Sequence, residues 1–506
     1  MTDKSLIIIG AGIAGLSAGC YAQMNGYKSR IFEMHDKPGG LCTSWKRKGF
    51  TIDCCIHWLV GSAPGNPFYR FWEELGAVQG RRMIDHDEFG RIEGKDGEVL
   101  IMYTNIRRLE QHLRSIAPED SDVIDDLVNG IHAATRFSRT MMDKAPELFN
   151  IIDMCSMFFK MTPHMGFMRK WATVSIQDFA KRFKNPFLRE AFPLFFDLPD
   201  FPMIAVLMTL AWMHQKVAGY PIGGSLEFSK AIERRYLDLG GEIHYKSPVA
   251  KISVEDNKAT AIKLVDGSEH RADVIISAAD GHSTIFNMLD GEYIDDKIKG
   301  YYEKLPIFPA LVFVGIGAAG SFDDIAPTVS LINFPLAAPL KIGGRQLNRL
   351  TARVHNFDPT LAPKGKTVLT VFFDSDYSYW KELKNDPDKY KSEKEEVAGN
   401  IIKALDRRFP GLADQVEMYD MATPVTFERY TGNWQGSFEG WLITPRTLRM
   451  RMKKTLPGLD NFYMIGQWVV PGGGLPTGVM TGRHVMQIIC KRDGKKFVTM
   501  LPYCMS

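Results

Sequence analysis

Apolar runs and glycine-rich turns alternate at the start of the chain in the order of a strand, a helix and a second strand. Residues 6–9 form a short apolar run of the kind that parallel sheets bury on both faces. Residues 16–26 are typical of a helix ended by glycine, and residues 28–32 of a second strand with Glu33 at its end. The pattern therefore predicts a βαβ unit.

The same kind of pattern returns at two later places in the chain. Between residues 220 and 279 it predicts one amphipathic helix and then four strands, at 226–239, 242–245, 249–254, 259–264 and 274–277. Near the C-terminus, residues 462–465 predict a strand, and a glycine-rich turn at 471–474 leads into a helix that ends near residue 491.

Two regions of different composition separate these pieces. One is largely helical, with helices expected over 106–116 and 121–144; the other shows strands and one helix, over 393–408. We therefore predict an α/β fold with a discontinuous Rossmann-like domain and a second, substrate-binding domain that combines a mixed sheet with helices. The predicted boundaries are 1–63, 218–285 and 440–492 for the first domain, and 64–217 and 286–439 for the second.

The helical region contains a segment, residues 149–212, that is dense in Met, Phe and Trp. Ten of the 25 methionines lie between residues 141 and 213. Basic residues are interleaved with them, namely Lys160, Arg169, Lys170, Lys181, Arg182, Lys184 and Arg189. Two interpretations stay open: an ordinary helical cap with its own core, or an adaptable apolar lining that meets an anionic membrane surface and admits a lipophilic substrate.

Composition excludes several other classes of protein. The 506 residues carry 62 basic and 59 acidic side chains, a formal net charge of +3, which disfavours nucleic-acid binding. Seven scattered cysteines and 12 histidines show no metal-ligand spacing, so no metal site is expected and a reducing, cytoplasmic compartment fits best. No apolar run of about 18 residues occurs, so membrane contact would be peripheral.

A glycine motif follows the first predicted strand and carries the first chemical signal. Gly10, Gly12 and Gly15 form GxGxxG, which allows a tight turn, a close approach of pyrophosphate to the backbone, and close packing of helix on strand. Glu33 lies where a carboxylate can hold both ribose hydroxyls and repel a 2′-phosphate. The motif predicts binding of an adenosine dinucleotide without that phosphate.

A second GxGxxG occurs at Gly315, Gly317 and Gly320. The segment after it is too short and too irregular to form the helix that such a motif needs, and no acidic residue follows at the spacing of a second strand. We interpret this match as a strand that ends in a flexible turn.

The next segment distinguishes between cofactors. Pro38-Gly39-Gly40 is followed by Gly49, Asp53 and His57-Trp58, with Cys55 where a glycine is usual. In these motifs the chain resembles the FAD-dependent amine oxidase and phytoene desaturase superfamily, and is most similar to its carotenoid desaturase, carotenoid isomerase and retinol saturase branch. The resemblance implies FAD as cofactor.

The resemblance also implies which residues contact FAD. Gln467 stands where the family usually has Asp, and the turn at 471–474 would face the N1–C2=O edge of the flavin. The full expected set is Gly10, Gly12, Ala14, Gly15, Glu33, Gly39, Gly40, Leu41, His57, Val249, Ala279, Gly466, Gln467, Gly473, Gly474, Pro476 and Thr477.

Four residues are candidates for catalysis: His57, Trp58, Arg429 and Asn433. A histidine beside the flavin would be able to move a proton near neutral pH. The expected reaction is desaturation, saturation or isomerisation of a conjugated apolar isoprenoid such as a carotenoid or retinoid. Two alternatives stay open: a flavin amine oxidase, and a non-enzymatic relative that binds a prenylated protein. The oligomeric state stays open as well.

Overall fold

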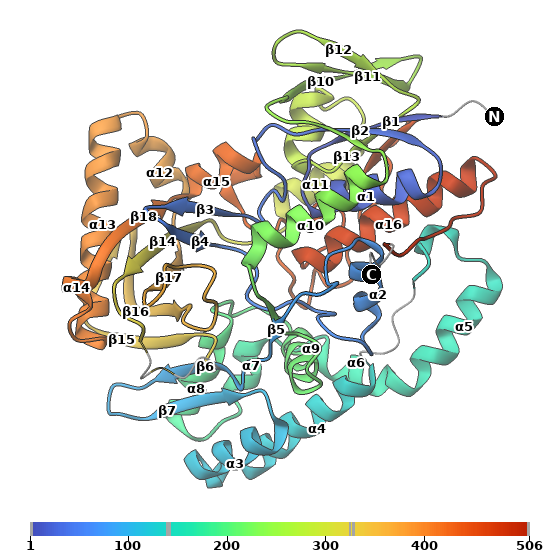
Figure 1. Ribbon diagram of the computed structural model, residues 1–506. Coiled ribbons are helices and arrows are strands. Elements are labelled where there is room, and N and C mark those ends of the chain that lie inside the picture. Colours follow the sequence, from blue (N-terminus) through green and yellow to red (C-terminus); the bar gives the residue numbers. More distant parts are fainter. Residues whose placement is uncertain (1–3, 138–142, 323–324, 326–328, 503–506) are drawn as a thin grey trace.

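The computed structural model describes residues 4–137, 143–322, 325 and 329–502 (Figure 1). Its first sheet has five strands, all parallel, in the order β19-β13-β1-β2-β9. These strands come from three separated segments of the chain: β1 (Ser5–Ile9), β2 (Lys28–Phe32), β9 (Glu242–His244), β13 (Val274–Ser277) and β19 (Phe462–Met464). Leu6, Ile7 and Ile8 in the central strand are fully buried, as the continuous apolar run predicts.

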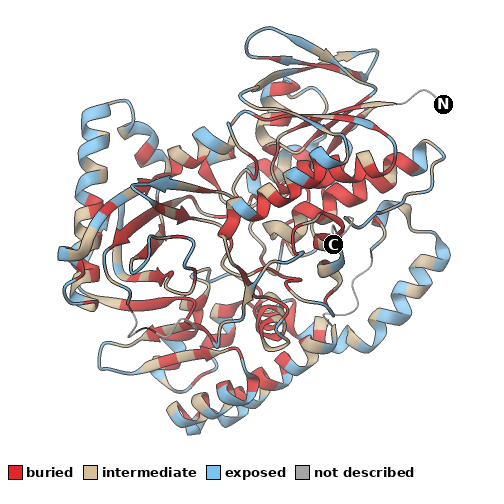
Figure 2. Cartoon of the chain, viewed as in Figure 1, coloured by how far each residue is buried: buried red, intermediate tan, exposed pale blue. Residues whose placement is uncertain are grey.

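Three helices pack against this sheet, and two of them meet through glycine. They are α1 (Ile13–Met24), α10 (Gly224–Asp238) and α16 (Gly474–Arg492). A Cβ added at Gly482 of α16 would lie 2.7 Å from the carbonyl oxygen of Ala14 in α1, so the two helices approach to backbone contact. Figure 2 shows α1 and α16 buried along most of their length.

The other face of the sheet is covered by a small antiparallel sheet and a helix. These elements are β10 (Val249–Glu255), β11 (Lys258–Leu264), β12 (Glu269–Arg271) and α11 (Asp296–Lys304). Their apolar residues, including Ile252, Ile262 and Ile298, form one core with Ile7 and Ile275 of the parallel sheet.

A second, seven-stranded sheet has the order β18-β14-β17-β16-β15-β6-β7, with one parallel pair, β15–β6. Its strands are β6 (Glu88–Glu93), β7 (Val99–Tyr103), β14 (Leu311–Ala318), β15 (Ile332–Ile342), β16 (Arg345–Val354), β17 (Thr367–Asp374) and β18 (Val416–Ala422). Helices at the left of Figure 1 accompany this sheet: α12 (Tyr377–Leu383), α13 (Pro387–Arg408), α14 (Leu412–Gln415) and α15 (Pro424–Thr431).

The remaining helices lie in the lower and right-hand parts of Figure 1. They are α2 (Pro67–Glu74), α3 (Ile106–Ile116), α4 (Ser121–Phe137), α5 (Ile151–Met161), α6 (Met165–Trp171), α7 (Ile176–Ala180), α8 (Pro186–Ala191) and α9 (Met203–His214). The short strand pairs β3 (Ser44–Arg47) with β4 (Phe50–Asp53), and β5 (Met83–Ile84) with β8 (Tyr220–Pro221), lie between the layers. Among the described residues, no helix is long and apolar enough to cross a membrane.

The predicted α/β class, with a Rossmann-like parallel sheet and a mixed sheet, is confirmed, whereas the exact domain boundaries stay predictions. The predicted strand 28–32 and helix 106–116 coincide with β2 and α3. Helix α13 begins six residues earlier than predicted, because Asp386 accepts a hydrogen bond from the Lys389 N–H (3.2 Å) and caps it. The predicted helix 121–144 is observed as far as Phe137, and residues 138–142 lie outside the described part of the chain.

The second glycine motif is part of the mixed sheet, as its sequence context indicates. Gly315 and Gly317 lie within β14, which is paired on both sides. A Cβ at Gly315 would lie 2.5 Å from Ile52, and one at Gly317 would lie 2.7 Å from Phe50. These glycines therefore give room for β4 to pack on the sheet.

The packing of α1 gives a testable prediction. A Cβ added at Gly15 would lie 2.0 Å from the carbonyl oxygen of Gly10, so Gly15→Ala forces helix and turn apart. We expect a loss of about 1–3 kcal/mol of folding stability, as for an overfilled core, measured as a lower midpoint of thermal unfolding. The matched control is Gly399→Ala in α13, where nothing lies within 4 Å; it should keep or raise the midpoint. Equal midpoints for wild type and Gly15→Ala would contradict the packing.

Candidate functional site

Two adjoining cavities lie between the parallel sheet, the mixed sheet and the helices. The smaller has a volume of about 320 Å³ and is lined by the ends of β1, β2 and β13, the start of α1 and the residues that follow β19. The larger has a volume of about 1250 Å³ and is lined by α6, α9 and the mixed-sheet strands β14, β16 and β17. The smaller cavity thus lies at the carboxyl ends of parallel strands, where open α/β sheets bind their ligands.

Gly10 and Gly12 form one wall of the smaller cavity. Gly10 follows β1 with φ +97°, a backbone conformation that favours glycine. Gly12 precedes α1, and the Gly39 N–H donates to the Ala11 carbonyl at 2.9 Å, so residues 39–41 lie along this turn. The start of α1 therefore lines the cavity, and no side chain caps the free N–H groups of its first turn.

Glu33 closes the same wall at the end of β2. Its carboxylate accepts the Ala11 N–H at 2.6 Å and the His35 N–H at 2.8 Å, and the residue is 6% exposed. Burial raises the pKa of this carboxyl, while the two backbone donors oppose that shift. The carboxylate is therefore held rigidly at the edge of the cavity.

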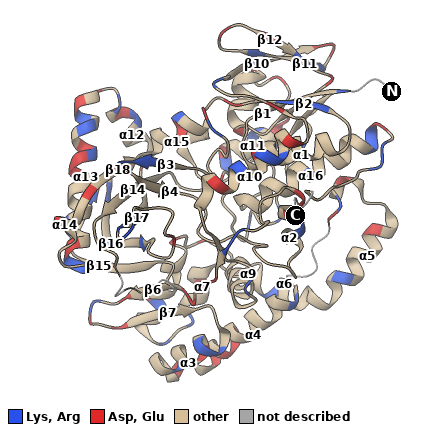
Figure 3. Ribbon diagram, in the orientation of Figure 1, with Lys and Arg blue, Asp and Glu red and all other residues tan. Residues whose placement is uncertain are grey.

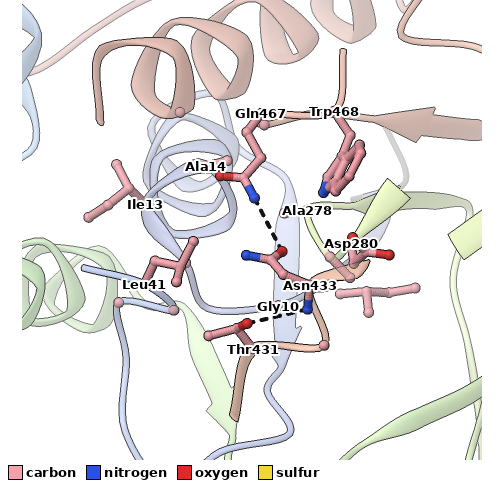
Figure 4. Close-up of a pocket in the computed structure, with 18 of the residues that line it drawn as sticks. Gly10, Ile13, Ala14, Leu41, Ala278, Asp280, Thr431, Asn433, Gln467 and Trp468 are labelled. Carbon is pink, nitrogen blue, oxygen red and sulfur yellow. Dashed lines mark hydrogen bonds between the residues drawn. The ribbon is translucent and has the colours of Figure 1, made fainter. Parts of the chain in front are cut away.

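Polar side chains from distant segments meet in the middle of the smaller cavity (Figure 4). The Gln467 side-chain amide donates to Asn433 Oδ1 at 3.2 Å, and the Asn433 N–H donates to Thr431 Oγ1 at 3.3 Å. Asp280, buried after β13, accepts the Trp434 N–H at 3.0 Å and so ties the segment after α15 to the parallel sheet. Burial raises the pKa of Asp280 to about 7.

The two cavities share a wall. Six residues line both of them: Leu41, Cys55, Phe438, Glu439, Gly474 and Leu475. Glu439 is the acidic member, and burial raises the pKa of its carboxyl to about 8, with no charged group opposing the shift. A protonated carboxyl group and the first residue of α16 therefore lie where the cavities meet.

The larger cavity is mostly apolar. Its walls include Trp58, Phe89, Phe195, Phe201, Ile204, Met208, Trp212, Phe313 and Phe372. His57 stacks on Phe372 with ring centroids 5.7 Å apart, and the Arg353 guanidinium lies 5.7 Å from the same ring. Burial, Arg353 and His355 hold the pKa of His57 well below its usual value, so its imidazole is neutral.

The structure brings most of the predicted cofactor residues together. The smaller cavity is lined by Gly10, Gly12, Ala14, Glu33, Gly39, Gly40, Leu41, Val249, Ala279, Gly466, Gln467 and Gly474. Gly15 lines neither cavity and acts through packing. The larger cavity is instead lined by His57, Gly473, Pro476 and Thr477. Their contact with a cofactor stays a prediction.

The four predicted catalytic residues are not gathered at one point. His57 and Trp58 line the larger cavity, but a neutral imidazole with a strongly lowered pKa is a poor proton shuttle near neutral pH. Asn433 lines the smaller cavity. Arg429 is exposed on α15 with its guanidinium 5.2 Å from the Tyr430 ring, and it lines neither cavity.

Three residues in the cavity walls were missed by sequence reasoning: Asp280, Glu439 and Arg353. Asp280 directly follows Ala279, a predicted cofactor residue, and Glu439 lies six residues after the catalytic candidate Asn433. Arg353 lies near the end of a strand, and only the packing of the sheets shows that it faces a cavity. Within the described residues, no group of His, Cys, Asp and Glu is arranged to hold a metal ion.

Comparisons with known proteins agree over nearly the full length of the chain. The model of the family described as "Flavin containing amine oxidoreductase" matches residues 13–490. The chain is 25% identical over 515 residues to a phytoene desaturase (neurosporene-forming) of Rhodobacter capsulatus, a match covering 96% of this chain and 93% of that protein. It is also 25% identical over 509 residues to a chloroplastic prolycopene isomerase of Daucus carota, covering 96% and 80%.

Solved structures show the same fold at lower identity. A variant of putrescine oxidase superposes with a TM-score of 0.62 at 13% identity, covering 97% of this chain and 99% of that one. The shared architecture therefore extends through both sheets and the helical region, beyond the glycine motif alone.

The raised pKa of Glu439 predicts how stability depends on pH. Between about pH 5 and 8 this carboxyl stays protonated in the folded protein but ionises in the unfolded chain, so the native state binds more protons and stability falls as pH rises. We expect Glu439→Gln to remove this loss. The thermal-unfolding midpoint of the variant should therefore rise relative to that of wild type as the pH increases from 5 to 8.

The control for this measurement is Glu395→Gln on α13, whose side chain is 56% exposed. Its midpoint should differ from wild type by the same small amount at every pH. A difference between wild type and Glu439→Gln that does not change with pH would show that Glu439 ionises normally.

Proposed function

The chain belongs to the flavin containing amine oxidoreductase family, with sequence relatives among carotenoid desaturases and isomerases, and on that premise we propose that it is an FAD-dependent oxidoreductase acting on C–C or C=C bonds of a conjugated apolar isoprenoid. The observation that carries the proposal is the shared wall, where a dinucleotide-type cavity opens on an apolar cavity of about 1250 Å³. Desaturation, saturation and isomerisation of a carotenoid or retinoid-like lipid all fit this arrangement.

The smaller cavity suits FAD in its shape and in its donor set. Gly10, Gly12 and the start of α1 would hold the pyrophosphate, and Glu33 would hold the ribose hydroxyls. Val249 lines the same cavity and its backbone would contact adenine, and Gln467 with Asn433 would hold polar groups between the two ends. A Cβ at Gly39 would lie 2.2 Å from the Cys42 carbonyl oxygen, so this turn is fixed without side chains filling the cavity.

Bound FAD would supply the hydride chemistry, and the chain supplies orientation and environment. The N–H groups at the start of α16, beginning at Gly474, bring the positive end of a helix dipole to the shared wall and favour electron-rich ligands there. Phe438 and Leu475 add apolar side chains to the same wall, where they would limit the access of water to a bound cofactor. Glu439 holds a proton at its carboxyl group, within the wall that both cavities share.

The two alternatives fit the cavity less well. An amine substrate is a cation, and the buried charged group in the larger cavity, Arg353, is also a cation that would repel it. A protein that only binds prenylated partners has no need of the Gly10–Gly12 turn and Glu33 at the wall of a cofactor cavity.

An exposed apolar helix supports delivery of the substrate from a membrane surface. No residue of α5 is buried, and Ile151, Ile152, Phe158 and Phe159 are 62–78% exposed (Figure 2). Met165 in the next helix is 56% exposed and also lines the larger cavity. We infer that this helix contacts the bilayer beside the mouth of the cavity.

The basic residues near this segment contribute less to membrane binding than their number indicates. Lys170 and Arg182 both pair with Asp126, and Lys181 pairs with Asp178 at 2.8 Å. In Figure 3, α5 itself carries few charged residues. Apolar insertion rather than net positive charge is therefore the main attraction that we propose.

The reaction is tested by anaerobic titration of the FAD-loaded protein, first with a carotenoid or retinoid and then with an amine. We expect the polyene, and not the amine, to bleach the flavin absorption band or to be isomerised after the flavin is reduced, with products identified by chromatography. Protein that retains no flavin after incubation with FAD, or a flavin reduced by the amine alone, would contradict the proposal.

The role of Glu33 gives a second test. Glu33→Gln can accept only one of the two backbone N–H groups that the carboxylate accepts, and it loses the charge toward the ribose. We expect FAD to dissociate about tenfold more readily, measured by flavin fluorescence on dilution, since hydrogen bonds to a charged group contribute about 1.5–3 kcal/mol. Glu242→Gln, on the neighbouring strand β9 and 66% exposed, should retain FAD as wild type does. Unchanged retention in Glu33→Gln would count against the ribose contact.

The contact of α5 with membranes gives a third test. Phe158→Ser combined with Phe159→Ser removes two exposed aromatic side chains, each contributing about 1.5–3 kcal/mol when buried in lipid. We expect co-sedimentation with phosphatidylcholine–phosphatidylglycerol vesicles to fall at least about tenfold. The control, Lys181→Gln with Arg182→Gln, should reduce it far less. A larger loss in the control than in the aromatic variant would place the contact at Lys181 and Arg182 instead.

A further inference from the structure

One buried cation in the larger cavity has no anionic partner. Arg353 lies on β16, paired with Thr370 of β17, and is only 4% exposed. It lines the larger cavity together with Thr351, Leu331 and Phe372. Within the described part of the chain, no Asp or Glu makes an ion pair with it, although ion pairs are the usual reason for a buried arginine.

The guanidinium is also short of hydrogen bonds. Its Nη1 donates to the carbonyl oxygen and the hydroxyl of Ser330, at 3.2 and 2.8 Å. Its Nε is buried without any acceptor. A guanidinium carries five N–H donors in a planar fork that suits a carboxylate, so most of this capacity is unused by the protein.

The neighbouring ionisable groups add no negative charge. His57 and His355 are the histidines beside Arg353, and burial together with the guanidinium lowers the pKa of both, that of His355 to about 3. Both imidazoles are therefore neutral at physiological pH. Burial lowers the pKa of Arg353 only to about 9, so the guanidinium keeps its charge there.

Two other carboxylates line the same cavity, and neither pairs with Arg353. Asp374 pairs with Arg345, and Asp197 is an exposed residue. Glu439 in the shared wall is protonated, and burial alone shifts its pKa, so no nearby cation acts on it. Three further arginines that line the cavity, Arg169, Arg449 and Arg451, are exposed. Among the described residues, the one buried charge that the cavity presents to a ligand is therefore the positive charge of Arg353.

We propose that Arg353 binds a carboxylate group of the substrate, so that the cavity takes an unsaturated, apolar acid rather than a neutral hydrocarbon or an amine. One guanidinium balances one negative charge, and its fork matches both carboxylate oxygens. The apolar walls of the cavity would contact the hydrocarbon part of the ligand. The proposal rests on the proposed function, because it names the substrate class for that same cavity, and it places the acid group beside His57 and Phe372.

The test compares ligands that differ mainly at one end. Binding of all-trans retinoic acid, retinol and geranylgeranyl diphosphate to the FAD-loaded full chain is measured by quenching of tryptophan fluorescence, without turnover. We expect retinoic acid to bind at least tenfold more tightly than retinol and than the diphosphate, whose several charges one buried guanidinium does not balance. Equal binding of retinoic acid and retinol, or tighter binding of the diphosphate, would overturn the proposal.

Variants separate a ligand-binding role from a structural one. Arg353→Met should lose the preference for retinoic acid over retinol, and its thermal midpoint should not fall, because an uncompensated buried charge is removed. Arg353→Lys should keep part of the preference. Arg349→Met on the same strand, which removes a cation that does not line the cavity, should keep all of it. A preference that persists in Arg353→Met would overturn the proposal, whatever the stability of the variant.

Failure of this inference is distinguishable from failure of the proposed function. If neutral polyenes and polyene acids reduce the flavin equally well, the oxidoreductase function stands and the carboxylate site does not. If the protein retains FAD but neither kind of polyene reduces the flavin or is isomerised by the protein, the proposed function itself fails, whatever the binding constants show.

Discussion

The close approach of α1 and α16 is the contact on which the rest of the site depends. A Cβ at Gly482 would lie 2.7 Å from the Ala14 carbonyl oxygen, and one at Gly478 would lie 3.3 Å from Ile13. Because these positions carry no side chain, the last long helix of the chain packs on the first one. Segments separated by more than 440 residues therefore line one cavity, with Gly10 at one end of the sequence and Gly466 at the other.

The larger cavity sets the charge states that decide its chemistry. Removal from water keeps Glu439 protonated and His57 neutral, whereas Arg353 stays charged because the pKa of a guanidinium starts so high. The outcome is a proton held in the wall between the cavities and, among the described residues, a single buried cation among aromatic side chains. This arrangement favours an apolar ligand with one anionic group and disfavours a cationic one.

Local sequence patterns predicted the parts of the structure that local interactions determine. The βαβ unit, the glycine turn, Glu33 and the two later α/β pieces follow from apolar periodicity and from the needs of a phosphate-binding backbone. The start of α1 was placed three residues late, because the glycines at its first turn obscure the helical pattern. The Met-rich segment was recognised, and only the structure divides it into a buried helix, α9, and an exposed one, α5.

What the sequence did not reveal depends on contacts between distant segments. The basic residues interleaved between 160 and 189 were one expected contact with an anionic membrane surface, but Asp126 and Asp178 pair with Lys170, Lys181 and Arg182. Asp280, Glu439 and Arg353 gain their properties from burial between sheets that no local pattern specifies. His57 illustrates the converse: its position was marked by a motif, yet its surroundings make it a poor acid or base at neutral pH.

The central claim is that a cofactor bound in the smaller cavity presents its reactive ring to the apolar cavity. A crystal structure of the protein with FAD tests this most directly. The account predicts adenine beside Val249 and Glu33, and the flavin ring at the wall formed by Leu41, Cys55, Glu439 and Gly474, with one face open to the larger cavity. FAD bound elsewhere, or a flavin ring separated from the larger cavity by protein, would contradict it.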